Sequence, residues 1–174
     1  MSNEIYLYYA VKEGRTNDVQ SFLKCDIDPN AYKTMAENAL YAAVYEGYQD
    51  IALLLISAGA IVNHLDAFGE APLHTAAYRG QKEMVLALIS NGANINEATH
   101  YGRTALHNAA WQGHYDIVSL LTANEPNINQ AMFDGKAPLH FAAREEILMS
   151  LLLTKGANIN QTTDAYIALT ISNY

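Results

Sequence analysis

Apolar residues recur along the chain with the spacing of short amphipathic helices that come in pairs. Between residues 104 and 123, Leu106 and Ala110 fall on one face of a first helix, and Val118 continues the apolar pattern in a second. Gly113 stands between them, where a residue that adopts the left-handed backbone conformation can end one helix before the next begins. The pattern therefore predicts a helix–turn–helix unit in this stretch.

The same run of letters returns at a fixed interval. It reads NALYAAVYEGY at 38–48, APLHTAAYRGQ at 71–81, TALHNAAWQGH at 104–114 and APLHFAAR at 137–144. Successive copies begin 33 residues apart. A constant period of this length is typical of repeat proteins, in which each repeat buries its apolar face only by stacking on its neighbours.

These copies, most of them followed by a GANIN-type segment, resemble the ankyrin repeat, and the resemblance covers nearly the whole chain. It implies an all-α solenoid of stacked helix–turn–helix pairs with short β-hairpin fingers. We expect a single ankyrin-repeat domain over residues 1–174, with about five repeats plus a truncated sixth. The repeats are predicted at about 1–30, 31–63, 64–96, 97–129, 130–160 and, in part, 161–174.

Glycines and apolar runs place the helices of the first four repeats. The first pair is predicted over residues 2–25 without a preceding hairpin, as an atypical amino-terminal cap with Gly14 between its helices. Asp26 stands where later repeats have a glycine, and aspartate is among the few residues that tolerate a left-handed backbone. The later pairs are predicted near 38–46 and 48–57, 71–79 and 81–90, and 104–112 and 114–123, with Thr104 able to cap its helix through its hydroxyl.

Two irregularities interrupt the fourth and fifth repeats. Glu125 replaces the glycine after the fourth pair, which costs about 1 kcal/mol if its backbone is left-handed. The fifth repeat lacks the central glycine, and we expect a tight turn near 144–146. The alternative is one continuous helix over 138–155, about 27 Å long, which could not stack both of its halves on the previous pair.

A third irregularity is the segment after Asn160, which begins a sixth finger and helix. Either Ile167, Leu169 and Ile171 fold back as an improvised cap, or the chain is a piece of a longer protein. The sequence favours the second reading, because a terminal repeat is expected to present a polar outer face.

Composition narrows the function classes. The net charge of −8, with no basic run, argues against nucleic acid or an anionic membrane as a partner. The single cysteine, Cys25, cannot form an internal disulfide, which suits a reducing compartment. The start of the chain shows no secretory signal, and the longest apolar run, 51–62, is too short to span a membrane. We therefore expect a soluble, cytoplasmic monomer.

The histidines raise the question of a metal site. His74, His107 and His140 occupy the same place in three repeats, and Tyr41 replaces them in the second. Stacked helices lie about 8–10 Å apart, so these histidines cannot share a zinc ion whose bonds are about 2 Å long. The ankyrin resemblance implies instead that this residue ties the finger to the helix by hydrogen bonds. We expect no metal and no cofactor.

Catalytic motifs are missing from the sequence. No GxSxG, HExxH or phosphate-binding loop occurs, and no base stands near Cys25 in the chain to activate it as a nucleophile. We assign Cys25 to packing at a helix end and expect a protein that is not an enzyme.

Asparagines close the GANIN-type segments at a fixed phase, at Asn63, Asn96, Asn129 and Asn160. The resemblance implies that this residue buttresses the turn. In some members of the family the same asparagine is hydroxylated, and the sequence leaves that alternative open.

Residues that repeat stacking does not fix are the candidates for binding. The resemblance places them at the finger tips and on the exposed face of the first helices, the concave side in this family. They are Met35, Phe68, His100, Tyr101, Arg103 and Phe133 from the fingers, and Tyr45, Tyr78, Arg79, Trp111 and Arg144 from the helices. Large aromatic groups thus form two rows across the middle repeats, a composition typical of protein interfaces. The alternative is that Tyr78 and Trp111 only pack on neighbouring fingers.

We therefore predict a non-enzymatic module that binds a protein partner of unknown identity through its concave helix and finger surface. The alternative is a targeting or regulatory segment of a larger protein, including a bacterial effector that acts in the host cytosol. Fold and function are only loosely linked in repeat proteins, so the sequence does not name the partner.

Overall fold

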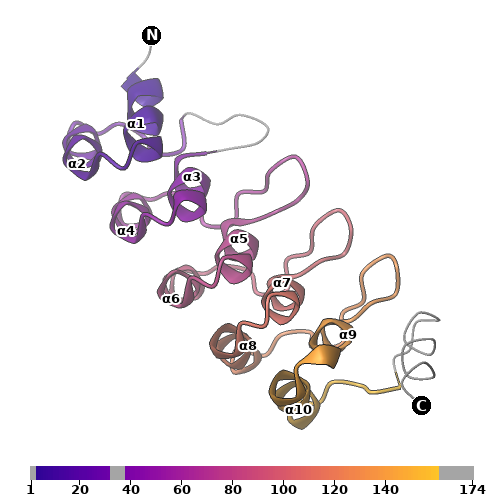
Figure 1. Cartoon of the computed structure of the whole chain (residues 1–174). Helices are drawn as coiled ribbons and strands as arrows, with labels where there is room; N and C mark the ends of the chain where they lie inside the picture. Colours follow the sequence, from indigo (N-terminus) through magenta and orange to yellow (C-terminus); the bar gives the residue numbers. More distant parts are fainter. Residues whose placement is uncertain (1–2, 32–37, 161–174) are drawn as a thin grey trace. The chain divides into compact units, whose positions relative to one another are not determined.

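The computed structural model describes residues 3–31 and 38–160, and helices joined by turns make up this part of the chain (Figure 1). The helices come in pairs, as the 33-residue period predicts. Their bounds are α1 Asn3–Lys12, α2 Thr16–Lys24, α3 Ala39–Glu46, α4 Gln49–Ser57, α5 Pro72–Tyr78, α6 Lys82–Ser90, α7 Ala105–Trp111, α8 Tyr115–Thr122, α9 Pro138–Phe141, the 3-10 helix η1 Ala142–Arg144, and α10 Glu146–Thr154. Two predicted features, the finger with Met35 and the segment 161–174, lie outside the described residues.

The chain divides into two compact units, which are described separately. The amino-terminal unit comprises Met1–Ala76 with Gln81–Asn94, and the carboxy-terminal unit comprises Ala77–Gly80 with Ile95–Tyr174. In the first, α1 packs on α2 and α3, while α4 lies between α2 and α6. The apolar faces meet in a core whose largest fully buried side chains are Leu7, Leu40, Ile51, Leu55, Leu73 and Leu88.

In the carboxy-terminal unit, α7 packs on α8 and α9, and α8 packs on α10. Leu106, Ile117, Leu121 and Leu152 are fully buried between these helices. The two units therefore use the same packing of first helix on first helix and second helix on second helix.

In the first and third pairs, the turn between the two helices requires glycine for two reasons. Gly14 has φ +68°, and a Cβ placed on it would lie 2.9 Å from the ring of Tyr48 in the next repeat. Gly80 has φ +74°, and its Cβ would lie 2.8 Å from the ring of His114. Each glycine thus supplies a left-handed backbone and leaves room for a side chain of the following repeat.

Asp26 and Glu125 occupy left-handed positions where other repeats have glycine. Both have φ +54°, which confirms the left-handed backbone expected at Asp26 and shows that Glu125 adopts it as well. The fold therefore carries a local strain of about 1 kcal/mol at each site.

Glycine at either site is expected to stabilise the protein. Asp26→Gly and Glu125→Gly should each raise the free energy of unfolding by about 0.5–1 kcal/mol, because glycine adopts positive φ without a steric penalty. Urea denaturation measures this change. As a matched control, Gln20→Gly, at an exposed position within α2, should lower the free energy by about 1 kcal/mol. Equal destabilisation by all three variants would contradict the backbone strain at Asp26 and Glu125.

The fifth repeat keeps its helix–turn–helix form without a glycine. Its first helix is the single turn α9, continued by η1, and the chain turns at Glu145, with φ −120° and ψ 94°, before α10 begins. This confirms the tight turn predicted near 144–146 and rules out the continuous helix. Because of this turn, α10 packs on α8 and buries Leu148 and Leu152. A straight continuation of α9 would place these two leucines away from α8.

The three described fingers between repeats are tight turns, and a backbone hydrogen bond joins the two ends of each finger. Their N–H groups donate from Asp66 to Glu70 O (3.0 Å), from Thr99 to Arg103 O (2.8 Å) and from Met132 to Lys136 O (2.9 Å). The hairpins predicted from the resemblance are this short, and no strand occurs within residues 3–31 and 38–160.

An asparagine side chain joins each repeat to the next. Asn63 Nδ2 donates to Gly92 O (2.9 Å), while its Oδ1 accepts from the N–H of Asn94 (2.8 Å). Asn30 makes the same two hydrogen bonds with Gly59 and Ile61, and Asn129 makes them with Gly156 and Asn158. Asn96 Oδ1 accepts from the N–H of Asn127 at 2.6 Å. We call this set the asparagine clamp, and it confirms the buttressing role predicted for the GANIN-type segments.

Loss of one clamp is expected to destabilise the array. Asn63→Ala removes two hydrogen bonds that connect successive repeats, which should lower the free energy of unfolding by about 1–2 kcal/mol in urea denaturation. Asn91→Ala serves as the control, because Asn91 Nδ2 donates only locally, to Ala87 O at 2.8 Å. Equal effects from the two substitutions would show that the clamp adds nothing to an ordinary surface hydrogen bond.

Candidate functional site

The structure places nine of the eleven candidate residues in full. Tyr45, at the end of α3, and Phe68, on a finger, belong to the amino-terminal unit, whereas the other seven belong to the carboxy-terminal unit: Tyr78, Arg79, His100, Tyr101, Arg103, Trp111 and Phe133. Met35 lies outside the described residues, and Arg144 is described only by its backbone at the end of η1. The two aromatic rows that would cross both units stay a prediction.

Within the carboxy-terminal unit, two rings and one guanidinium gather around Trp111. The Tyr78 ring meets it edge-on, with centroids 6.4 Å apart and planes at 80°, and the Phe141 ring stacks on it at 5.9 Å and 27°. Arg103 Cζ lies 5.3 Å from the centre of the indole. Trp111 nevertheless keeps 53% of its surface exposed. We call Tyr78, Arg103, Trp111 and Phe141 the Trp111 cluster.

The repeat geometry brings these four residues together. Tyr78, Trp111 and Phe141 are the last residues of α5, α7 and α9, the first helices of three successive repeats. Arg103 closes its finger by accepting from Thr99 N–H, directly before Thr104 at the start of α7. Tyr78 and Trp111 are therefore held at helix ends whose spacing follows from the stacking of the repeats, and Phe141 joins them from a position three residues earlier in its repeat.

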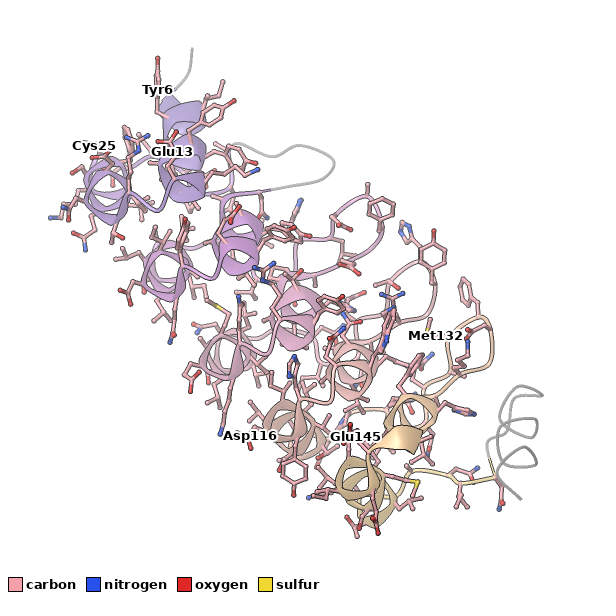
Figure 2. All side chains as sticks on the ribbon, viewed as in Figure 1. Tyr6, Glu13, Cys25, Asp116, Met132 and Glu145 are labelled. Carbon is pink, nitrogen blue, oxygen red and sulfur yellow. The ribbon has the colours of Figure 1, made fainter. Side chains whose placement is uncertain are left out.

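Two exposed rings lie on neighbouring fingers of the same unit. Phe133 N–H donates to Tyr101 O at 3.1 Å, so one finger backbone rests on the other. A Cβ on Gly102 would lie 3.0 Å from Met132 Cα, which shows how closely the fingers approach. Phe133 is 82% exposed, and Figure 2 shows the labelled Met132 on the same finger. Tyr101 and Phe133 thus present large apolar surfaces on a fixed backbone.

The amino-terminal unit carries a smaller aromatic pair. Tyr45 is exposed and stacks on Tyr41, with ring centroids 6.2 Å apart and planes at 18°. Burial raises the pKa of Tyr41, whose hydroxyl bonds to Thr75. Tyr41 is therefore a structural residue, in keeping with its place at the histidine position of the other repeats.

His107 connects α7 to the following finger. Its Nδ1 accepts from the N–H of Thr104 at 3.1 Å and lies 2.9 Å from the Thr104 hydroxyl, so the ring proton is on Nε2 and donates to Lys136 O at 3.2 Å. Burial lowers the pKa of His107 to about 4, so the ring is neutral at pH 7. His74 and His140 likewise accept from the backbone N–H three residues earlier, which confirms the structural role predicted for these histidines.

The family follows from these features and from a direct comparison. A family model described as ankyrin repeats matches the chain three times, over residues 7–99, 41–132 and 91–163. The chain belongs to the ankyrin repeat family. No curated protein matches it. Ankyrin repeats are generally protein–protein interaction modules and typically non-enzymatic, so the family identifies the broad class of function but no particular partner.

One member of the Trp111 cluster was missed by sequence reasoning. Phe141 contacts both Trp111 and His107, with centroids 6.0 Å apart in the second case. In the third and fourth ankyrin repeats, the residue after the equivalent histidine is Thr75 or Asn108, both small and polar. A large ring in place of a short polar side chain was therefore the available signal.

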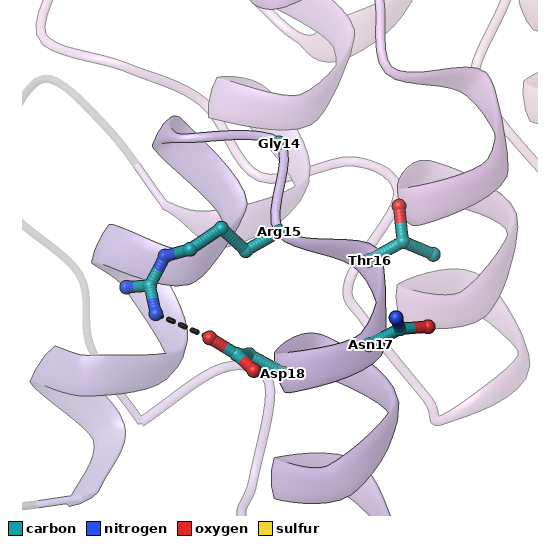
Figure 3. A pocket seen from close by; sticks show the side chains of 5 residues that line it. All are labelled: Gly14, Arg15, Thr16, Asn17 and Asp18. Carbon is teal, nitrogen blue, oxygen red and sulfur yellow. Dashed lines mark hydrogen bonds and ion pairs between the residues drawn. The ribbon is translucent and has the colours of Figure 1, made fainter.

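One hollow of the amino-terminal unit is lined by none of the candidate residues. It has a volume of about 420 Å³ and is lined by Gly14, Arg15, Thr16, Asn17 and Asp18, in the turn between α1 and α2 (Figure 3). Arg15 pairs there with Asp18 and, at 2.8 Å, with Glu13. These ion pairs lie on an exposed surface, and no group in the turn marks it as a reaction centre.

Three further findings bear on alternative functions. In residues 3–31 and 38–160, no group of three His, Cys, Asp or Glu side chains is placed to hold a metal ion. The same part of the chain holds no helix that is long and apolar enough to cross a membrane. Cys25 is exposed, so its predicted packing role is wrong. It is the C-cap residue of α2, a position that is also exposed at Ala58 and Asn91 in the next two repeats.

The buried neutral His107 predicts a pH dependence of stability. Because its pKa is lower in the folded chain than in the unfolded chain, the unfolded chain binds more protons between about pH 6.5 and 4. Stability should therefore fall as the pH falls, by about 3 kcal/mol from this group. An NMR titration of the His107 ring should give a midpoint near 4.

The variant His107→Gln tests the same point through unfolding. The free energy of unfolding of each protein is measured in urea between pH 5 and 6. Its slope against pH should be smaller for the variant than for the native chain, by about 1 kcal/mol per pH unit. Carboxyl groups titrate in both proteins and cancel in this difference. An unchanged slope, together with a ring that titrates near 6.5, would show that His107 is not buried in its neutral form.

Proposed function

We propose that this ankyrin protein binds a protein partner without catalysis, and that the Trp111 cluster is the main anchor of the interface. The observation that carries the proposal is an indole that three neighbours hold in place while half of its surface remains exposed. Stacking of the repeats does not require a tryptophan there, since the fold needs only a solvated helix end.

The composition of this surface supports binding. Trp, Tyr and Arg are the residues most often found at the energetic centre of protein interfaces. Tyr78 and Trp111 both end helices, and contacts with other rings restrict the Trp111 side chain before any partner arrives. A restrained side chain loses less conformational entropy on binding, so more of its contact energy appears as affinity.

The exposed surface of Trp111 is large enough to contribute substantially to binding affinity. Burying the open half of a tryptophan removes about 100 Å² of apolar surface from water, which is worth about 2–3 kcal/mol. That contribution alone corresponds to an affinity change of roughly 30- to 150-fold. The exposed rings of Tyr101 and Phe133 extend the apolar surface along the fingers of the same unit.

In the amino-terminal unit, Tyr45 and Phe68 carry exposed rings at equivalent repeat positions. We propose that they form a separate, secondary contact surface of that unit. Their contribution is expected to be smaller, because the Tyr45 ring stacks on one tyrosine, while Trp111 is held by two rings and a guanidinium.

Removal of the anchor should abolish partner capture. The double variant Tyr78→Ala, Trp111→Ala deletes two rings of the cluster and is expected to lose the proteins that the native chain retains in a quantitative pull-down from cell lysate. The lost ring contacts should also lower the free energy of unfolding by about 1–3 kcal/mol, so circular dichroism must first show a folded chain.

The matched control is the double variant Tyr6→Ala, Tyr115→Ala, which removes two rings of similar exposure (46% and 44%) on α1 and α8. This control should capture the same proteins as the native chain. If a folded Tyr78→Ala, Trp111→Ala protein still captures them, the interface lies elsewhere.

A further inference from the structure

We propose that His114 is the positioning residue of the Trp111 anchor. Its ring ties the carboxyl end of α5 to the turn that follows α7, and this tie holds the Tyr78 ring against the indole of Trp111. The inference rests on the proposed function and names the residue on which the orientation of the anchor depends. His114 is not a member of the Trp111 cluster and acts on the indole through Tyr78.

The His114 ring forms a hydrogen bond with the residue that carries the Tyr78 ring. Nε2 of His114 lies 3.1 Å from Tyr78 O. A carbonyl oxygen only accepts, so Nε2 carries the proton of this bond. Tyr78 is the last residue of α5, where a carbonyl has no N–H partner within its own helix. The bond therefore satisfies a helix end and fixes the backbone of Tyr78 at the same time.

The same ring lies against the backbone of the turn after α5. A Cβ on Gly80 would lie 2.8 Å from Cε1 and 3.0 Å from Nε2 of His114, so a larger residue would displace the imidazole. Residues Ala77–Gly80 belong to the carboxy-terminal unit, as do His114 and Trp111. A close contact and a hydrogen bond thus hold this segment on the His114 ring.

The backbone of His114 is fixed to the helix that carries Trp111. Its N–H donates to Ala109 O of α7 at 2.9 Å, and its carbonyl accepts from the N–H of Val118 in α8 at 2.9 Å. Trp111 stands three residues before His114, at the end of α7. The indole and the imidazole therefore extend from one hydrogen-bonded turn.

Tyr78 and Trp111 are consequently joined twice, once through their rings and once through His114. The ring centroids lie 6.4 Å apart, and edge-to-face pairs are favourable at about 4.5–7 Å. A displacement of Tyr78 by about 1 Å away from Trp111 would take the pair out of this range. The hydrogen bond from His114 restrains the Tyr78 backbone against such a displacement.

A glutamine makes the same kind of tie one repeat earlier, within the amino-terminal unit. Gln81 stands 33 residues before His114, and its Nε2 donates to Val44 O, in the last turn of α3, at 2.9 Å. A Cβ on Gly47 would lie 3.4 Å from that nitrogen. His114→Gln is accordingly the conservative variant, and Gln81→Leu is the matched control that removes an equivalent tie in the other unit.

The fluorescence of Trp111 tests the positioning directly, because the chain contains one tryptophan. Time-resolved fluorescence anisotropy of the full chain measures how freely the indole rotates on the nanosecond timescale. In His114→Leu, the ratio of freely rotating to held indole should rise about 2- to 12-fold, which corresponds to the loss of one aromatic pair. His114→Gln should stay close to the native chain.

A double-mutant cycle shows whether His114 acts through Tyr78. Tyr78→Ala deletes the ring and sets the size of the full effect. Adding His114→Leu to Tyr78→Ala should loosen the indole no further. Gln81→Leu should lower the urea midpoint as His114→Leu does, but leave the rotation of Trp111 unchanged. Circular dichroism establishes that each variant is folded.

The outcomes separate this inference from the proposed function. The positioning role is wrong, and the Trp111 anchor unaffected, if His114→Leu lowers the urea midpoint without loosening the indole. It is also wrong if Gln81→Leu loosens the indole equally, or if His114→Leu has its full effect without the Tyr78 ring.

The pull-down tests the anchor itself. If His114→Leu loosens Trp111 as expected and retains less of the proteins that the native chain captures, both the positioning role and the anchor are supported. If the loosened variant retains the same amount, the tie through His114 stands, but the anchor assigned to Trp111 is wrong.

Discussion

The architecture depends on the asparagine clamp. An ankyrin repeat cannot bury its apolar face alone, so its stability comes from the interface with the next repeat. Within each unit, the amide of an asparagine accepts from one backbone N–H and donates to one backbone carbonyl of the following repeat, as Asn63 does with Asn94 and Gly92. These two bonds satisfy polar groups of a turn and fix the register between neighbouring helix pairs.

A fixed register decides where the helix ends lie, and the helix ends carry the rings. Tyr78 and Trp111 hold the same position in successive repeats and end α5 and α7, so the spacing of repeats becomes the spacing of these two rings. Phe141 reaches Trp111 from a position three residues earlier in its own repeat. His107 strengthens this arrangement, because its ring holds the finger at Lys136 and contacts Phe141 edge-on. The same neutral imidazole thus supports both the scaffold and the cluster, and its low pKa follows from that burial.

A surface built in this way suits recognition. Its side chains are held by neighbours that stacking has already placed, so a partner meets rings whose freedom is restricted in advance. The left-handed residues Asp26 and Glu125 show that the array also tolerates local strain where a glycine has been replaced. That strain lies in the turns that follow the second helices, whereas the rings of the cluster end the first helices.

The sequence by itself determined the repeat period, the helix bounds to within one or two residues, the left-handed turns and the break in the fifth repeat, because local backbone preferences and a 33-residue period fix these features. It also singled out Trp111, since a ring stands where stacking requires none. Only the tertiary structure decided which groups surround that ring. Phe141 and Arg103 reach it because neighbouring repeats stack and their side chains adopt particular rotamers, and spacing along the chain does not encode a rotamer. The tautomer and low pKa of His107 were decided there too, because both depend on burial between elements that meet only in the folded chain.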